Sequence, residues 1–207
     1  MVLLAKEQVE VKLTPQEIVE KTTIADVYRA VKNLDGVIYK TKLIYSDYFS
    51  NLSHNDIYIK PENLQKTGSF KLRGAYNCIS QLSEEQKAHG VIAASAGNHA
   101  QGVAYAAQQL GVKAVIVMPA TTPLLKVEAT RAYGAEVVLS GDSFDDAAAK
   151  AVELQQEFNY TFIHPFNDIE VILGQGTTAL EIIDDLKDVD AILVPIGGGG
   201  QSITSRK

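Results

Sequence analysis

Short runs of apolar and β-branched residues alternate with helix-length segments from Asp56 onward. Each run is apolar at consecutive positions, which is typical of strands that are covered on both faces, as in a parallel sheet with crossover helices. The pattern therefore predicts an α/β fold with a mostly parallel sheet and helices on both faces. The predicted strands span residues 57–59, 91–94, 112–118, 136–139, 161–163 and 191–196.

Helical spacing of apolar residues fills most of the remaining chain. Thr14, Pro15 and Glu17 predict a capped helix start, and Asp35 with Gly36 predicts where that helical region ends. Gly111 and Gly134 stand where left-handed helix ends need glycine. Residues 37–55 read as a connector with a short strand or helix. The other predicted helices span residues 69–82, 84–89, 98–110, 123–133, 143–158 and 175–186.

Composition excludes several classes of function. The 207 residues are 46% hydrophobic and 21% charged, as in a soluble globular protein, and a net charge of -6 argues against nucleic acid as a partner. No apolar stretch approaches the ~20 residues that cross a bilayer, and residues 1–7 lack the features of a signal peptide, so we expect no membrane association and a cytoplasmic location. One cysteine and four scattered histidines predict no metal site.

Lys71 is the first candidate for chemistry, because it follows a strand and its loop and falls in the first turn of a predicted helix. The positive end of a helix lowers the pKa of a lysine, which favours the uncharged, nucleophilic amine. The alternative is that Lys71 and Arg73 form a solvated helix face.

Two glycine-containing segments are candidate anion sites. Ser95 to Gly102 joins a predicted strand to a helix, where free backbone N–H groups can bind a carboxylate or phosphate, unless it is a plain turn capped by Asn98. Gly197 to Gly200 follows the last predicted strand and can bind a phosphate through its backbone, unless it is a flexible linker. Dinucleotide, nucleoside-triphosphate and serine-hydrolase motifs are absent. A lysine with two anion sites suits an aldehyde cofactor that carries a phosphate.

Together these motifs resemble the fold type II pyridoxal-phosphate enzymes (tryptophan synthase beta-like), and among them the threonine dehydratase (threonine ammonia-lyase) family. The resemblance runs from about Thr14 to Gly200 and includes Lys60-Pro61-Glu62-Asn63 and Gly174-Gln175-Gly176-Thr177. It implies that Lys71 is the catalytic lysine that bonds to pyridoxal 5'-phosphate. It further implies cofactor contacts from Phe70, Asn98, Gly197, Gly198, Gly199 and Gly200, and substrate-carboxylate contacts from Ser95, Ala96, Gly97, Asn98 and His99.

The implied reaction is β-elimination of L-threonine to 2-oxobutanoate and ammonia, with L-serine as a second substrate, as in amino-acid metabolism and isoleucine biosynthesis. The resemblance also implies a homo-oligomer. One alternative is a serine dehydratase or racemase of the same fold, although serine racemases carry a serine where this chain has Ala96. Another is a non-catalytic, truncated fragment that binds a phosphate ligand or a partner chain.

The resemblance implies two domains, with residues 56–141 forming a small domain inserted into a large cofactor domain made of residues 1–55 and 142–207. After Gly200 the family continues with a helix and further chain, whereas residues 201–207 depart from its pattern. We therefore expect the C-terminal part of the large domain to be missing.

Overall fold

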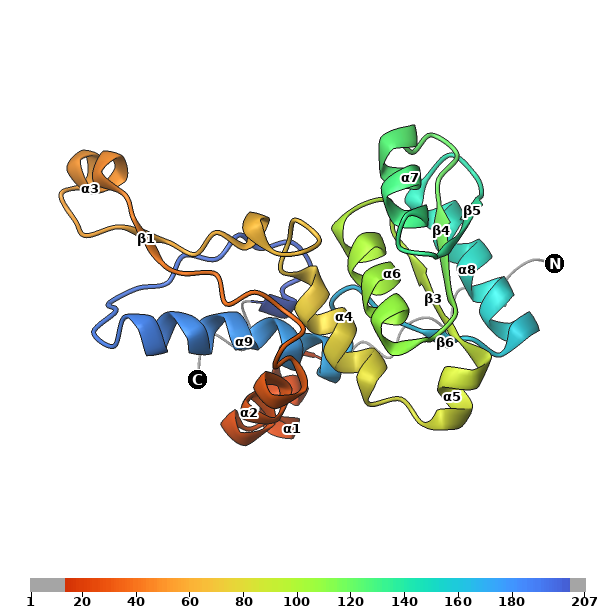
Figure 1. The fold of residues 1–207 in the computed structure, drawn as a ribbon, viewed down its shortest axis with the longest axis horizontal. Coiled ribbons are helices and arrows are strands. Elements are labelled where there is room, and N and C mark those ends of the chain that lie inside the picture. Colours follow the sequence, from red (N-terminus) through yellow and green to blue (C-terminus); the bar gives the residue numbers. More distant parts are fainter. Residues whose placement is uncertain (1–13, 202–207) are drawn as a thin grey trace.

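The computed structural model describes residues 14–201. The expectations for residues 1–7 and for the tail beyond Gln201 lie outside this range. A sheet with its helices forms one end of the molecule, and helices α1, α2 and α9 with a projecting arm form the other end (Figure 1). Helix α4, which begins at Lys71, lies between the two ends.

A four-stranded parallel sheet confirms the predicted α/β class. Its order is β5-β4-β3-β6, and Val91 of β3 is paired with Ala114 on one side and Thr161 on the other. The chain passes outward from β3 to β5 and then returns to place β6 on the opposite side of β3. The strands are β3 (Val91–Ala94), β4 (Ala114–Met118), β5 (Glu136–Leu139) and β6 (Thr161–Phe162).

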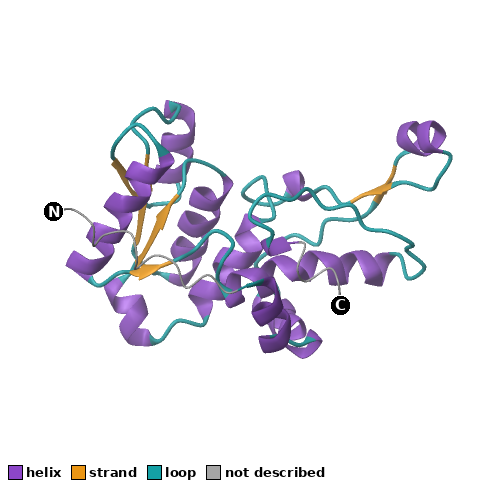
Figure 2. Ribbon diagram, turned by 180° about the vertical axis from the view of Figure 1, so that it is seen from behind, coloured by secondary structure: helices purple, strands orange, loops and turns teal. Residues whose placement is uncertain are grey.

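Helices cover the sheet on both faces, as the consecutive apolar positions predicted (Figure 2). Alternate residues of β4 face opposite ways: Ile116 packs in a core with α6 and α7, whereas Val117 packs in a core with α8. All five residues of β4 are buried. The covering helices are α6 (Asn98–Leu110), α7 (Leu124–Arg131) and α8 (Phe144–Phe158).

Most of the remaining elements build the other end of the molecule, whereas helix α5 lies near β6 at the end that holds the sheet (Figure 1). Strands β1 and β2 pair antiparallel and, with α3, form an arm that projects from the body in both views (Figures 1 and 2). The elements are α1 (Pro15–Lys21), α2 (Ile24–Asn33), β1 (Ile44–Tyr45), α3 (Asp47–Ser53), β2 (Tyr58–Ile59), the 3-10 helix η1 (Glu62–Leu64), α4 (Lys71–Ser80), α5 (Glu84–His89) and α9 (Ile169–Asp185).

Local signals placed most helix ends correctly. The capping box of Thr14 and Glu17 forms, and Gly111 and Gly134 have φ values of 65° and 80°. Helix α9 differs, because it begins at Ile169 rather than at residue 175. The carboxylate of Asp168 accepts a hydrogen bond from the backbone N–H of Val171 at 3.0 Å and so caps the earlier start.

The strand predicted over residues 191–196 does not form. This segment has no secondary structure, and the side chains of Leu193 and Ile196 are 89% and 73% exposed. An apolar run becomes a strand only where a neighbouring strand supplies hydrogen-bond partners for its backbone. In the described part of the chain, nothing pairs with this run.

The sheet takes in elements from both sides of the expected domain boundary at residue 141. Helix α8 and strand β6 lie beyond that residue, yet α8 packs on β3 and β4, and β6 pairs with β3. The division into a small domain of residues 56–141 and a large domain of residues 1–55 and 142–207 stays a prediction.

Glycines allow α4 to approach two helices at backbone distance. A Cβ on Gly102 of α6 would lie 3.1 Å from the backbone of Lys71, and one on Gly174 of α9 would lie 2.5 Å from the carbonyl oxygen of Arg73. A Cβ on Gly74 would likewise lie 2.6 Å from the carbonyl oxygen of Val171. The position of α4 therefore depends on the lack of side chains at these crossings.

Among the described helices, none combines the length and apolar character that a bilayer span requires.

Replacing Gly174 by Ala should destabilise the fold by about 1–3 kcal/mol, because the new methyl group must push α4 and α9 apart. The free energy of unfolding in urea measures the effect. Gly97→Ala is the control, since no atom of the described residues lies within 4 Å of a Cβ there. Equal stability of the two variants would contradict a packing role for Gly174.

Candidate active site

Lys71 lies in the first turn of α4, as the sequence predicted, although the helix begins at Lys71 itself rather than at residue 69; its side chain is partly buried. Its Nζ donates a hydrogen bond to the carbonyl oxygen of Pro165 at 2.6 Å and lies 5.5 Å from the centre of the Phe70 ring. Burial lowers the pKa of Lys71, because the charged ammonium loses contact with water. The lowered pKa suits a nucleophile, although burial rather than the helix end is its cause.

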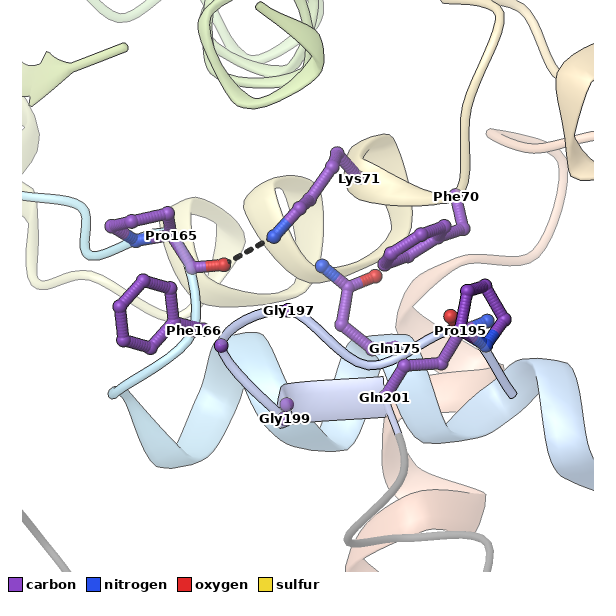
Figure 3. A pocket seen from close by; sticks show the side chains of 11 residues that line it. Phe70, Lys71, Pro165, Phe166, Gln175, Pro195, Gly197, Gly199 and Gln201 are labelled. Atoms are coloured by element: carbon purple, nitrogen blue, oxygen red, sulfur yellow. Dashed lines mark hydrogen bonds between the residues drawn. The ribbon is translucent and has the colours of Figure 1, made fainter.

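A cavity of about 120 Å³ brings Lys71 together with the glycine run. The chain of Gly197 to Gly200 lies across this cavity from the lysine (Figure 3). A Cβ on Gly198 would lie 2.2 Å from the Phe166 ring, and Gly199 has a φ of 83°. A side chain at position 198 would therefore collide with Phe166, and a residue other than glycine at position 199 would have a strained backbone. The cavity is lined by Phe70, Lys71, Pro165, Phe166, Gln175, Pro195, Gly197, Gly198, Gly199, Gly200 and Gln201.

The second predicted anion site lies at the carboxyl end of β3, which is where open parallel sheets bind ligands. The hydroxyl oxygen of Ser95 accepts hydrogen bonds from the backbone N–H groups of Gly97 and Ala100, at 3.2 and 3.3 Å. Ser95, Ala96, Gly97, Asn98 and His99 do not line the cavity that contains Lys71. Their predicted contacts with cofactor and substrate therefore stay predictions.

His99 connects this loop to the lysine's surroundings through the backbone after β6. Its Nε2 lies 2.8 Å from the carbonyl oxygen of Ile163, two residues before the carbonyl that binds Lys71. A carbonyl can only accept, so Nε2 carries the proton. Burial lowers the pKa of His99 to about 3, with further lowering from the charge of Lys71. The ring is therefore neutral at physiological pH.

Arg73 is completely buried, so the solvated helix face considered for Lys71 and Arg73 is wrong. Its guanidinium donates two hydrogen bonds to Glu62, at 2.7 and 2.8 Å, and two to Glu181, at 2.7 and 2.9 Å. Lys60 forms an ion pair with Glu181 at 2.7 Å. Burial alone would lower the pKa of Arg73, but hydrogen bonds and charge from Glu62 and Glu181 outweigh it and raise the pKa.

Sequence reasoning missed part of the cavity wall. Pro165 and Phe166 gave no signal, because an apolar pair after a strand is common. Gln175 belongs to the quoted Gly174-Gln175-Gly176-Thr177 motif, but no role was assigned to it. The glycines on either side were the available signal, since they mark a helix that packs closely against another backbone.

Comparison with known proteins agrees with this geometry. The family model of pyridoxal-phosphate dependent enzymes matches residues 34–204. The chain belongs to this family. It is 54% identical over 178 residues to the L-threonine ammonia-lyase of Thermotoga maritima, a match that covers 86% of this chain and 44% of that protein. The chain spans only 35–54% of the length of this relative and of two L-threonine dehydratases, from Haemophilus influenzae and Escherichia coli.

Solved structures confirm the fold type II assignment. The processed form of threonine deaminase isoform 2 from Solanum lycopersicum is similar with a TM-score of 0.83 and 43% identity, over 89% of this chain and 52% of that one. Maize serine racemase is similar with a TM-score of 0.86 and 34% identity, over 89% of this chain and 57% of that one.

The residues around the cavity fit pyridoxal phosphate, the cofactor of this family. Lys71 supplies an amine with a lowered pKa, and the glycine run supplies backbone N–H groups without side chains. The buried amide of Gln175 lines the same cavity, and neither of its polar atoms has a hydrogen-bond partner among the residues that the structure describes. A polar ligand at this place would satisfy it.

Replacing Glu62 by Gln should destabilise the protein by about 3–5 kcal/mol, because Arg73 and Lys60 would then share one buried carboxylate. Urea unfolding measures the loss. Glu153→Gln is the control, since Glu153 is 62% exposed in its pair with Lys150 and should change little. A small effect at Glu62 would mean that water reaches Arg73.

Stability should fall as the pH drops below 6.5, because the unfolded chain then protonates His99 whereas the folded chain keeps it neutral to about pH 3. Between pH 6.5 and pH 5 the loss from this group should be about 2 kcal/mol. The free energy of unfolding at the two pH values measures it. In the variant His99→Gln this part of the pH dependence should vanish; an unchanged slope would show that other groups cause it.

Proposed function

We propose that this chain carries the pyridoxal-phosphate site of an ammonia-lyase that converts L-threonine to 2-oxobutanoate and ammonia, and more slowly L-serine to pyruvate. The observation that carries the proposal is the cavity itself, which places an amine of lowered pKa opposite a glycine run. The name of the 54% identical relative, an L-threonine ammonia-lyase, supports the choice of reaction and substrate.

Lys71 has two tasks in this proposal. Its Nζ would hold the cofactor covalently until the amine of the substrate displaces it, and the freed Nζ would then be the base that takes the proton from the substrate α-carbon. When bound, the cofactor supplies an electron sink that makes the α-proton removable. The carbonyl oxygen of Pro165 accepts a hydrogen bond from Nζ and so orients the amine within the cavity. Burial helps by favouring the uncharged, proton-accepting form.

The other predicted contacts complete the proposed site. Gly197 to Gly200 hold the phosphate through backbone N–H groups, and Phe70 packs beside the ring. Asn98 binds the ring hydroxyl, and the segment from Ser95 to His99 binds the substrate carboxylate at the amino end of α6. That segment starts at the carboxyl end of β3, and β6 beside it leads into Pro165 and Phe166 of the cavity wall.

A serine racemase is the second candidate, because the maize enzyme of that name has a closely similar fold. Racemisation needs a group that returns a proton to the face opposite the lysine. The resemblance assigns that position to Ala96, whose methyl group has no exchangeable proton. Elimination needs no such group, so Ala96 favours the lyase.

The cytoplasm is the compartment we propose, because the single cysteine, Cys78, is free and buried, as suits a reducing environment.

A homo-oligomer is proposed as well. Large apolar side chains lie exposed on the arm, with Tyr48 at 72% and Leu52 at 68%, and such surface favours association.

Borohydride reduction in the presence of pyridoxal phosphate should fix the label on the peptide that contains Lys71, as peptide mass spectrometry would show. Lys71→Ala should take up no label at this site and lose threonine turnover. Lys66→Ala is the control, because Lys66 is close in the chain but does not line the cavity. Labelling of another lysine to the same extent in Lys71→Ala would refute the assignment.

A further inference from the structure

Gln175 is a buried amide in the cavity wall. It lies on α9 with 1% of its surface exposed, and within residues 14–201 neither its Nε2 nor its Oε1 has a hydrogen-bond partner. An unsatisfied buried amide costs free energy in a folded protein, so such groups are uncommon unless a ligand completes them. The amide reaches from α9 into the space between Lys71 and Phe70, above the glycine run (Figure 3).

Close packing fixes the direction of this side chain. The Nε2 of Gln175 lies 2.6 Å from the place where a Cβ of Gly74 would be, so the amide occupies space that the glycine leaves open. Glycine at position 74 therefore allows the amide to pack against α4 in the helical turn that contains Lys71. Packing against a helix backbone limits the rotation of the side chain and keeps its polar end in the cavity.

The charges around the cavity indicate what the amide binds. Among its lining residues only Lys71 carries a charge, and its amine is committed to the aldehyde end of the cofactor in the proposed function. The phosphate must then be held by neutral donors. A phosphate oxygen accepts hydrogen bonds, and the side-chain N–H of Gln175 is a donor without an acceptor in the described part of the chain.

We propose that the side-chain amide of Gln175 donates a hydrogen bond to the phosphate of the bound cofactor and is a second part of the phosphate site, in addition to the glycine run. The inference rests on the proposed function, since it takes pyridoxal phosphate as the ligand. It adds one residue, from α9, to the contacts that sequence resemblance assigned to Gly197 through Gly200.

Comparing two ligands tests this contact. Pyridoxal has the ring and aldehyde of pyridoxal phosphate but no phosphate, and both change their absorption when they bond to a lysine. Their dissociation constants are measured by absorption titration for the parent chain and for Gln175→Met, which keeps the length of the side chain but removes its donor. Gln175→Glu has nearly the same shape as the parent, but it places a negative charge beside the phosphate.

The expected result is a loss of affinity that depends on the phosphate. Gln175→Met should bind pyridoxal phosphate about 10- to 100-fold more weakly, the usual effect of losing a hydrogen bond to a charged group. Gln175→Glu should lose at least as much, and pyridoxal affinity should change less than about threefold in either variant. Inorganic phosphate, used as a competitor, should show a matching rise in its inhibition constant.

Thr178→Val is the matched control. Thr178 lies on the same helix, is 3% exposed and has an unpartnered hydroxyl, but it does not line the cavity. Its replacement should leave both affinities unchanged. Circular dichroism of each variant verifies that the chain is folded, and the near-isosteric Gln175→Glu keeps the test valid if the methionine variant unfolds.

Three results would overturn the inference. An equal loss for pyridoxal and pyridoxal phosphate would show that Gln175 supports the lysine or the ring rather than the phosphate. Unchanged affinities would show that the amide touches neither ligand. A parent chain that binds neither pyridoxal phosphate nor inorganic phosphate would refute the proposed function as well, which distinguishes that failure from the first two.

Discussion

Helix α4 lies in backbone contact with two other helices, and the geometry of the site follows from this constraint. Gly102 lets α6 reach the turn that contains Lys71, and the pair of Gly74 and Gly174 lets α9 reach the next residues. Side chains at these positions would separate the helices. Packing of the backbone therefore fixes the point from which the side chain of Lys71 extends into the cavity.

A buried charge cluster also holds α4 in place. Arg73 joins Glu62, which follows the arm, to Glu181 near the end of α9, and Lys60 balances the second carboxylate. Two positive and two negative groups leave this cluster without net charge. Burial opposes ionisation of Glu181, but hydrogen bonds from Arg73 and Lys60 lower its pKa. Such a cluster adds little net stability, yet it is costly to break, so it fixes one arrangement of these segments.

The cavity draws on parts of the chain that lie far apart in the sequence. The segment after β6 supplies both the carbonyl that binds Lys71 and the ring that packs on Gly198. It also supplies the carbonyl of Ile163, which accepts a hydrogen bond from His99, whose ring burial keeps neutral. This segment follows the carboxyl end of β6, which lies parallel to β3, so both strands end at the same edge of the sheet. Open parallel sheets bind ligands at this edge.

Local features of the sequence determined the class of fold, the helix caps and the place of Lys71 in the first turn of a helix. Apolar runs predicted β3 and β5 to the residue, and Thr14 and Gly111 marked helix ends, because these signals act over a few neighbouring positions. Residues 191–196 are apolar enough to predict a strand, but they do not form one. A strand needs a second strand beside it, and the local pattern of residues does not show whether one is present. The tertiary structure decided that Arg73 is buried and that Gln175 faces Lys71, because each depends on how closely α9 approaches α4.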